Sequence, residues 1–372
     1  MNTPSIRAAQ REDLNALCDL EQSCFSGDRL SRRSLSHMLR SEHAELLVAD
    51  GGAELAGYAL VLYRSGTNLA RLYSIAIRPQ WRGKGVSGEL LDSAERSARA
   101  RECAFMRLEV SVNNTAAVRL YERSGFHRFG RISAYYEDGS DAWRMEKTIR
   151  RQATGPTPKT RYYEQTTPFT CGPACLLMAL GRLDPEREMS RTEELRIWRE
   201  ATTVYMTSGH GGCSPHGLAL SAWRRGMDVS LFVTPSGTPF IDSVRDPEKK
   251  TVIELVHADY LAELEETDVA LNERELPPVE LLAALADGAV GITLISTWRL
   301  NRNRAPHWVV ITGADERYIY ISDPDFEREP WHSETDYIDV PLTHEEYRAM
   351  ARFGRSRLQA TLLLSDRKKK PA

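Results

Sequence analysis

The chain has 372 residues, of which 41% are hydrophobic and 27% charged, and its formal net charge is −3. This length exceeds one ordinary core and predicts two domains, while the nearly balanced charge argues against a nucleic-acid partner. No apolar run approaches the ~20 residues that a transmembrane helix needs, and the N-terminus is polar rather than signal-like. We therefore expect a cytoplasmic bacterial protein with no membrane partner, ending in a basic tail at residues 367–372.

The first 149 residues alternate helix and strand signals. Apolar residues recur at helical spacing between Glu12 and Cys24. Further helices are predicted at 31–39, 87–101 and 116–123, and strands at 45–49, 55–63, 71–77 and 104–110. Such alternation predicts an α/β domain over residues 1–149.

A polar segment with one glycine and two prolines, residues 150–160, predicts a linker to a second domain at residues 161–366. In that second domain, helices are predicted from Cys171, around 190–200, and at 215–225, 257–267 and 278–286. Strands follow at 290–295, 308–313, 318–322 and 358–364. Helices that precede a sheet in this way predict an α+β domain.

A basic, glycine-rich loop stands between a predicted strand and a predicted helix in the first domain. The strand ends with Ile75, Ala76 and Ile77, and the loop contains Arg82, Gly83, Lys84, Gly85, Val86 and Ser87. Glycines let backbone N–H groups crowd around an anion, and the dipole of the following helix adds to them. We therefore expect a pyrophosphate site, with a tight turn carrying solvated charges as the alternative.

A second motif, Leu-Glu-Val-Ser-Val-Asn-Asn-Thr-Ala-Ala-Val-Arg-Leu-Tyr-Glu-Arg-Ser-Gly-Phe, occupies residues 108–126. Together with the loop it resembles the GNAT superfamily of acetyl-CoA-dependent N-acetyltransferases, closest to the ribosomal-protein alanine acetyltransferases, over about residues 5–149. The resemblance implies acetyl-CoA as co-substrate and a mixed sheet that splays open beside residues 72–78. There the pantetheine arm of CoA would pair with the backbone of Ile75 and Ile77.

The same resemblance implies roles for individual side chains. Asn114 matches the asparagine that contacts CoA, and Tyr121 matches the general acid that protonates the departing thiolate. Glu109 matches the carboxylate that takes the amine proton, directly or through water. The alternatives are a core aromatic residue for Tyr121 and an exposed strand carboxylate for Glu109. Ser87 departs from the family's glycine or alanine in the pyrophosphate loop. The acceptor pocket would involve two segments, 25–35 and 130–140.

In the second domain, Cys171 follows a proline-containing turn and precedes an apolar helical run. A thiol at a helix N-terminus faces unpaired N–H groups and the positive end of the dipole, which favour thiolate over thiol. Gln165 could place an amide donor beside that sulfur, as papain-type peptidases do in their oxyanion hole. His307 opens one predicted strand and Asp323 closes the next, so antiparallel neighbours would bring the imidazole and carboxylate together.

These elements resemble the bacteriocin-processing cysteine peptidases, and more closely their stand-alone peptidase-like relatives, over about residues 160–365. The resemblance implies that Cys171 is the nucleophile, His307 the base, Asp323 the orienting acid and Gln165 the oxyanion donor. The alternatives are a buried cysteine, a core histidine and a turn-forming aspartate. Transporter-borne members usually carry aspartate directly before the nucleophile, where this chain has Thr170.

The remaining cysteines do not suggest a disulfide framework, and we expect no bound metal. Cys175, one helical turn after Cys171, is expected to be buried and inert. The glycine-rich loop 209–216 carries two histidines and a cysteine. We expect it to lead into a helix with Ser214 as the N-cap, and the alternatives are that it lines the cleft or binds a metal.

The sequence therefore predicts a bifunctional enzyme. An acetyl-CoA-dependent N-acetyltransferase, acting on an amine or a peptide N-terminus, would be fused to a cysteine peptidase that acts on a peptide or protein. One alternative is that one half is inactive and serves as a peptide-docking or acyl-CoA-sensing module. Another is that Cys171 passes its acyl group to an amine instead of water. A further hypothesis is that the peptidase exposes an N-terminus that the transferase acetylates.

Overall fold

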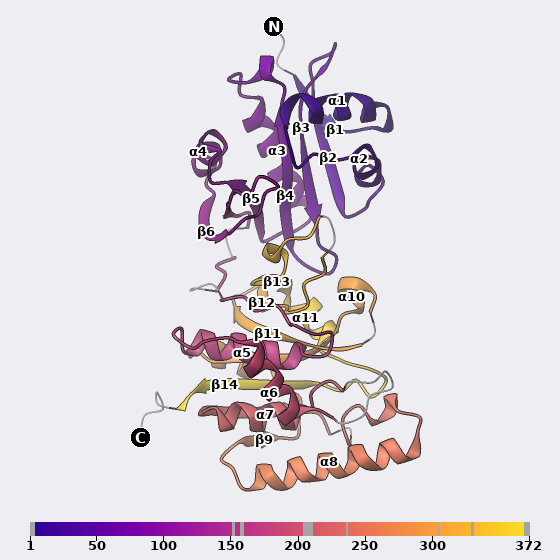
Figure 1. Ribbon diagram of the computed structural model, residues 1–372, viewed down its shortest axis with the longest axis vertical. Helices are drawn as coiled ribbons and strands as arrows, with labels where there is room; N and C mark the ends of the chain where they lie inside the picture. The colour runs from indigo at the N-terminus through magenta and orange to yellow at the C-terminus, as the bar shows by residue number, and fades with distance from the viewer. Residues whose placement is uncertain are drawn as a thin grey trace. The chain divides into compact units, whose positions relative to one another are not determined.

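The computed structural model describes residues 4–150, 153–156, 160–203, 211–235, 237–303, 305–328 and 331–367. The chain divides into two compact units, Met1–Thr154 and Gly155–Ala372, each with its own sheet (Figure 1). The boundary between the units falls in the segment expected to be a linker. Residues 151–152 and 157–159 of that segment, and residues 368–372 of the expected tail, lie outside the described residues.

The N-terminal unit is built on a seven-stranded sheet of order β1-β2-β3-β4-β5-β7-β6 within the described residues. Its strands are β1 (Ser5–Ala8), β2 (Ala44–Asp50), β3 (Leu55–Tyr63), β4 (Leu69–Ile77), β5 (Phe105–Ser111), β6 (His127–Ile132) and β7 (Ala142–Thr148). Its helices are η1 (Arg11–Asp13), α1 (Leu14–Cys24), α2 (Arg32–Met38), η2 (Pro79–Trp81), α3 (Val86–Ala100) and α4 (Thr115–Arg123). Neighbouring strands are antiparallel except for β4 and β5, so the sheet is mixed, as predicted.

The sheet opens between β4 and β5. The two strands pair only where Leu69–Arg71 lies beside Phe105–Arg107. β4 continues to Ile77 and β5 to Ser111, and β4 remains paired with β3 on its other side as far as Ile77. In the second half of β4, one backbone edge therefore has no partner strand among the described residues. This confirms the predicted splayed sheet.

The C-terminal unit has a second seven-stranded sheet, of order β13-β12-β11-β10-β14-β8-β9 in the described part of the chain. Its strands are β8 (Met227–Val233), β9 (Ala270–Asn272), β10 (Val290–Ser296), β11 (Pro306–Ala314), β12 (Tyr318–Ser322), β13 (Val340–Thr343) and β14 (Ala360–Asp366). Its helices are α5 (Cys171–Leu183), α6 (Arg191–Ala201), α7 (Pro215–Arg224), η3 (Ile241–Ser243), α8 (Pro247–Glu265), α9 (Pro278–Ala286), α10 (Trp298–Asn301), η4 (Glu334–Asp336) and α11 (His344–Met350). This arrangement is the predicted α+β fold.

Two expectations for this unit were wrong in detail. β8 interrupts the helical half of the domain and pairs with the last strand, β14, so the helices do not all precede the sheet. Helix α8 begins at Pro247, where Asp246 caps it, and not at His257. Within the described ranges, no helix is both long and apolar enough to cross a bilayer.

The alternation of side chains along β11 separates two apolar clusters. Trp308 and Val310 pack with α5 in one cluster, whereas Val309 and Ile311 belong to a cluster that also contains residues of α9 and α11. Because successive strand residues point to opposite faces, the central sheet separates these clusters. Residues 171–181 of α5 are all buried, which is typical of a helix enclosed on every side.

Candidate active sites

Cys171 is the first residue of α5, and it is buried, with 7% of its surface exposed. The apolar run that follows it buries the helix against the sheet, so the helix N-terminus is fixed at the end of the core. The first N–H groups of a helix have no partner within the helix. The sulfur therefore lies at the positive end of the helix dipole, as the sequence predicted.

His307 and Asp323 are joined by a short hydrogen bond. Nε2 of His307 lies 2.7 Å from Oδ1 of Asp323, and both side chains are buried. Burial lowers the pKa of the His307 imidazole, but Asp323 and then Cys171 raise it more, so the net pKa lies well above its usual value. Because Nε2 is bonded to the carboxylate, Nδ1 is the ring nitrogen left to face the Cys171 sulfur.

Gln165 is held by the segment that follows Asp323. Its backbone N–H donates to the carbonyl of Pro324 (2.9 Å), and its Nε2 donates to Oδ1 of Asp325 (2.8 Å). The backbone N–H of Asp325 in turn donates to Oδ1 of Asp323 (3.0 Å). One short turn thus fixes both the imidazole's partner and the amide, and Nε2 has a second hydrogen to offer. Asp325 was missed from sequence, although it stands two residues after a predicted site residue.

A buried carboxylate holds the next residue along the chain. Glu194 on α6 is fully buried and accepts from the backbone N–H of Thr166 (2.9 Å), from the Thr166 hydroxyl (2.6 Å) and from the Tyr163 hydroxyl (3.0 Å). A buried carboxylate needs several donors to be tolerated. Glu194 is therefore a second residue that positions the Gln165 segment and that sequence reasoning missed.

A small pocket of about 240 Å³, counting its open mouth, lies beside Cys171. The other residues that line it are Thr203, Gly212, Cys213, Phe240, Pro306 and Trp308. Phe240 adopts a left-handed backbone conformation (φ 66°), which is costly for a bulky residue and is often kept at functional sites.

The remaining thiols of the helix and the loop are buried. Cys175 is fully buried and donates to the carbonyl of Trp308 (3.1 Å), and burial raises its pKa well above the usual value. Cys175 is therefore buried, as expected. Ser214 caps α7 as predicted. His210, from the same glycine-rich loop, lies outside the described residues.

In the N-terminal unit, Ile75, Ala76 and Ile77 form the end of β4 beyond the last β4–β5 pair. Ile75 and Ile77 pair with Ala59 and Gly57 of β3, and no strand pairs with their other edge among the described residues. A pantetheine arm carries amides that match an unpaired strand edge.

The loop after this strand leads directly into α3. Gly83 and Gly85 have positive φ (74° and 84°), and nothing lies within 4 Å of a Cβ built on either residue. Gly85 is the N-cap of α3, so the N–H groups of Val86 and Ser87 belong to its unpaired first turn. The glycines leave space around these donors, and this cradle fits a pyrophosphate. Lys84 lies over the Trp81 ring at 5.0 Å.

Arg82 and Asn114 have other partners in this structure. Nε of Arg82 donates to the carbonyl of Ile77 (3.2 Å), which ties the loop to the end of β4. Asn114 is the N-cap of α4, where its Oδ1 accepts from the backbone N–H of Ala117 (3.1 Å). Its amide nitrogen is left to contact a ligand.

The two expected proton-transfer groups lie in different surroundings. Tyr121 is buried against the edge of Phe126 (ring centroids 5.7 Å apart), and burial raises its pKa. Glu109 forms a buried ion pair with Arg71 (2.8 Å), and Arg71 also donates to the hydroxyl of Tyr135 (3.0 Å). Glu109 is thus not the exposed strand carboxylate of the alternative interpretation.

The two segments expected to form the acceptor pocket contact each other. The backbone N–H of Asp28 donates to Glu137 (3.1 Å), and the backbone N–H of Glu137 donates to Asp28 (3.3 Å). Glu21, which sequence reasoning missed, is 2% exposed and accepts from the N–H of Leu30 (2.8 Å) and from the hydroxyl of Tyr58. Burial raises the pKa of this carboxyl.

Two family models match the chain. A model described as Peptidase_C39 like family matches residues 160–365, and a model described as an acetyltransferase (GNAT) domain matches residues 10–149. These matches cover the two units of the structure.

Relatives of the N-terminal unit are also found. A Bacillus subtilis protein named as a ribosomal-protein-alanine N-acetyltransferase is 30% identical over 146 residues, which are 39% of this chain and 95% of the relative. The N-alpha-acetyltransferase RimI of Mycobacterium tuberculosis is 31% identical over 157 residues, 41% of this chain and 95% of the relative. The crystal structure of a ribosomal-protein-alanine N-acetyltransferase from Escherichia coli aligns with 39% of this chain and 93% of its own, at 26% identity and a TM-score of 0.36.

The splayed sheet and its glycine-rich loop, with these relatives, define the N-terminal unit as an N-acetyltransferase of the GNAT class, with acetyl-CoA as co-substrate. The chain belongs to the Peptidase_C39 like family through its C-terminal unit, which spans more than half of its length. Both predicted resemblances, and the prediction of an enzyme, are therefore confirmed.

Proposed function

We propose that the chain is a bifunctional cytoplasmic enzyme: a GNAT-type N-acetyltransferase joined to a cysteine peptidase with the triad Cys171, His307 and Asp323. The observation that carries the peptidase half is the 2.7 Å contact between His307 Nε2 and Asp323 Oδ1. With Nε2 bound to the carboxylate, Nδ1 is the ring nitrogen that would face the sulfur at the start of α5 in this proposal. A thiolate beside an imidazolium is the resting state that this chemistry requires.

In the proposed reaction, the Cys171 thiolate attacks the carbonyl carbon of a peptide bond, and the carbonyl electron pair moves to oxygen. The second Nε2 hydrogen of Gln165 and the backbone N–H of Cys171 stabilise this oxyanion. The C–N bond then breaks, and His307 gives its proton to the departing amine. In the second half, His307 takes a proton from water, hydroxide attacks the thioester, and the acid leaves as the thiolate returns.

A peptide library digested with the whole chain and read by mass spectrometry tests this half. Wild type should produce defined cleavages, while Cys171→Ala and His307→Ala should produce none. Cys18→Ser, in the other unit, serves as the matched control and should cleave like wild type. Identical cleavages by wild type and Cys171→Ala would contradict the proposal. Added hydroxylamine separates hydrolysis from acyl transfer, because an acyl-transfer enzyme yields the hydroxamate in preference to the free acid.

For the N-terminal unit, we propose that acetyl-CoA supplies an acetyl thioester to a peptide or protein N-terminus. Two relatives bear names for alanine or N-alpha acetylation, which favours such an acceptor. In this proposal, the backbone of Ile75 and Ile77 aligns the pantetheine arm, and the donors of residues 82–87 hold the pyrophosphate. Tyr121 protonates the departing thiolate.

Glu109 would accept the amine proton in the same reaction. Arg71 holds this carboxylate in place through the 2.8 Å ion pair, and the proton would reach it directly or through a water molecule. Transfer of labelled acetyl from acetyl-CoA to peptides with a free N-terminus tests this proposal. Acetylation of free amines but never of peptides would contradict the proposed acceptor.

The two activities form one reaction sequence only if the product of the peptidase is an acceptor for the transferase. We therefore propose that cleavage supplies a new amino terminus that the N-terminal unit acetylates. Wild type given peptide and acetyl-CoA together should yield acetylated fragments, and Cys171→Ala should yield none while still acetylating a synthetic copy of the fragment. Fragments that stay unacetylated, while other peptides are acetylated, would contradict the coupling alone.

A further inference from the structure

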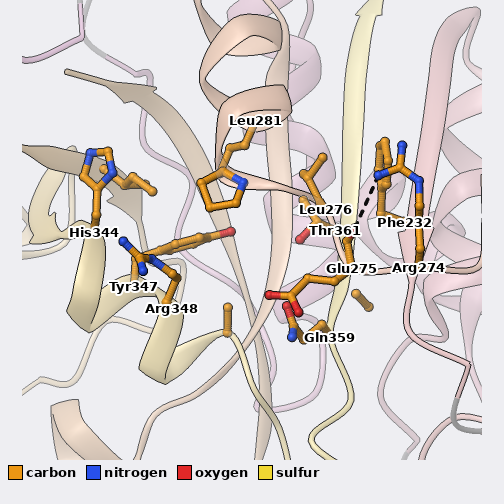
Figure 2. Close-up of a pocket in the computed structure, with 14 residues that line it drawn as sticks. Phe232, Arg274, Glu275, Leu276, Leu281, His344, Tyr347, Arg348, Gln359 and Thr361 are labelled. Atoms are coloured by element: carbon orange, nitrogen blue, oxygen red, sulfur yellow. Dashed lines mark hydrogen bonds between the residues drawn. The ribbon is translucent and has the colours of Figure 1, made fainter. Parts of the chain in front are cut away.

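A second pocket lies in the C-terminal unit (Figure 2), and the residues that line it do not include Cys171, His307 or Asp323. The empty space between its lining residues, with the open solvent at the mouth included, is about 530 Å³. Its buried apolar floor comes from β8, β12, β14, α9 and α11 and consists of Phe232, Leu281, Ile319, Tyr347, Ala351 and Ala360. Leu281, Ile319, Tyr347 and Ala351 belong to the apolar cluster that lies across the sheet from α5.

The hydroxyl groups at the pocket floor form hydrogen bonds with one another. The Tyr347 hydroxyl donates to Thr293 (3.4 Å), and the hydroxyls of Thr293 and Thr361 lie 2.9 Å apart. This chain of hydroxyls leaves the floor suited to an apolar group.

One face of α11 brings a cationic group to the mouth. His344, Tyr347 and Arg348 stand three and four residues apart and line the same pocket (Figure 2). The exposed Arg348 has no hydrogen-bond or ion-pair partner among the described residues. His344 is fixed by donating from Nε2 to the carbonyl of Asp315 (3.0 Å), which leaves Nδ1 for a ligand.

The other charges around the mouth are paired. Arg274 makes two hydrogen bonds to Glu280 (2.8 and 3.1 Å), and Glu275 lies 3.6 Å from Arg352. Among the described residues that line the pocket, Arg348 is therefore the charged side chain without an ion-pair partner. Gln359 adds a side-chain amide that has no hydrogen-bond partner in the described part of the chain, and such an amide can both donate and accept.

We propose that this pocket binds the carboxyl end of an N-acylated apolar residue. The carboxylate would pair with Arg348, whose guanidinium matches two carboxylate oxygens. The acyl amide would bond to the Gln359 side chain, and the apolar side chain would pack on Phe232, Leu281 and Tyr347. Free N-acyl amino acids and the C-terminal residue of a peptide share this chemistry.

The test uses the whole chain with Cys171→Ala, so that no ligand is cleaved. N-acetyl-L-phenylalanine and its neutral carboxamide are titrated separately by calorimetry. The acid should bind at least tenfold more tightly than the amide, because a hydrogen bond to a charged group is worth more than one to a neutral group. Arg348→Gln should remove that difference, while Arg355→Gln, an exposed arginine outside the pocket, should keep it.

Three further measurements decide where the ligand lies and what it is. Ala351→Phe, which fills the floor, should abolish binding of both compounds, and alkylating Cys171 in the wild-type chain should leave binding unchanged. A short peptide ending in phenylalanine that binds more tightly than the N-acetyl residue identifies a peptide C-terminus as the ligand, and the reverse order identifies a free N-acyl amino acid. Equal binding of acid and amide, no effect of Arg348→Gln, or no binding up to the solubility limit would each overturn the proposal.

Discussion

Nε2 of Gln165 donates a 2.8 Å hydrogen bond to Oδ1 of Asp325. The amide is therefore held by a residue that lies two positions after Asp323, the partner of His307. The same turn accepts the backbone N–H of Gln165 at Pro324. An oxyanion donor is effective only when it is held in place before the reaction, so we assign Asp325 as the residue that positions Gln165.

Asp325→Ala should lower kcat of peptide cleavage by about tenfold, because Gln165 remains but loses its support. Gln165→Ala should cost about 10²–10³-fold, the usual cost of a lost oxyanion donor. Asp325→Asn keeps an acceptor and should lie close to wild type. Alkylation of Cys171 needs no oxyanion hole, so its rate should not change. A slower alkylation in Asp325→Ala would instead indicate a general loss of structure.

The pyrophosphate loop provides a matched pair of glycines. Gly85 has φ 84°, whereas Gly88 lies in the first turn of α3 with ordinary helical backbone, and a Cβ on either would meet nothing within 4 Å. Gly85→Ala should cost about 1–2 kcal/mol in backbone strain or move the loop, and so raise KM for acetyl-CoA. Gly88→Ala should leave KM unchanged and stabilise the helix by up to about 1 kcal/mol. Equal KM values in the two variants would contradict the role of the loop.

Tyr121→Phe keeps the ring packed on Phe126 and removes only the hydroxyl. We expect kcat of acetyl transfer to fall by about 10²-fold, with KM for acetyl-CoA unchanged, because a general acid contributes at least that much. Since burial raises the pKa of Tyr121, the wild-type rate should show no alkaline loss up to about pH 10. Tyr63→Phe, another buried tyrosine of this unit, should behave as wild type.

His216 should make the C-terminal unit sensitive to acid. Burial, and then His257, lowers its pKa from 6.5 to about 3. Below about pH 6.5 the unfolded chain binds a proton that the folded chain excludes, so stability falls as the pH falls. Between about pH 7.5 and about pH 5 this loss amounts to about 2 kcal/mol in the free energy of unfolding.

Urea unfolding of the C-terminal transition at the two pH values measures this loss. His216→Phe keeps a ring beside His257. Its free energy of unfolding should fall less between the two pH values than that of wild type. His43→Gln, an exposed histidine in the N-terminal unit, should leave the loss unchanged. A pH dependence in His216→Phe as steep as in wild type would show that other groups cause it.

Strong local patterns predicted most of the elements that carry the sites. The apolar run after Cys171 and the amphipathic helix after Gly85 could be found because each has a clear start and a consistent period. The pairing of His307 with Asp323 was predicted because their strands were expected to be antiparallel neighbours. The two residues do lie at the same end of the antiparallel pair β11 and β12.

What the sequence did not predict depends on contacts between distant segments. β6 has an irregular burial pattern and lacks the period that identifies a strand. β8 does alternate apolar and polar residues from Met227 to Leu231, but this stretch is short and lies between helices, and the sequence analysis missed it. β8 is fixed by pairing with β14, more than 120 residues later. Asp325 and Glu194 hold the Gln165 segment from 160 and 28 residues away, and no local signal reveals such support.

The central claim is that His307 and Asp323 activate the thiol of Cys171. The most direct test is the rate of Cys171 alkylation by iodoacetamide at about pH 6, assigned by mass spectrometry, in wild type and in His307→Ala. We predict that wild type reacts at least about tenfold faster, because His307 can take up the proton of the Cys171 thiol when the sulfur attacks. Equal rates in the two proteins would contradict the proposed triad.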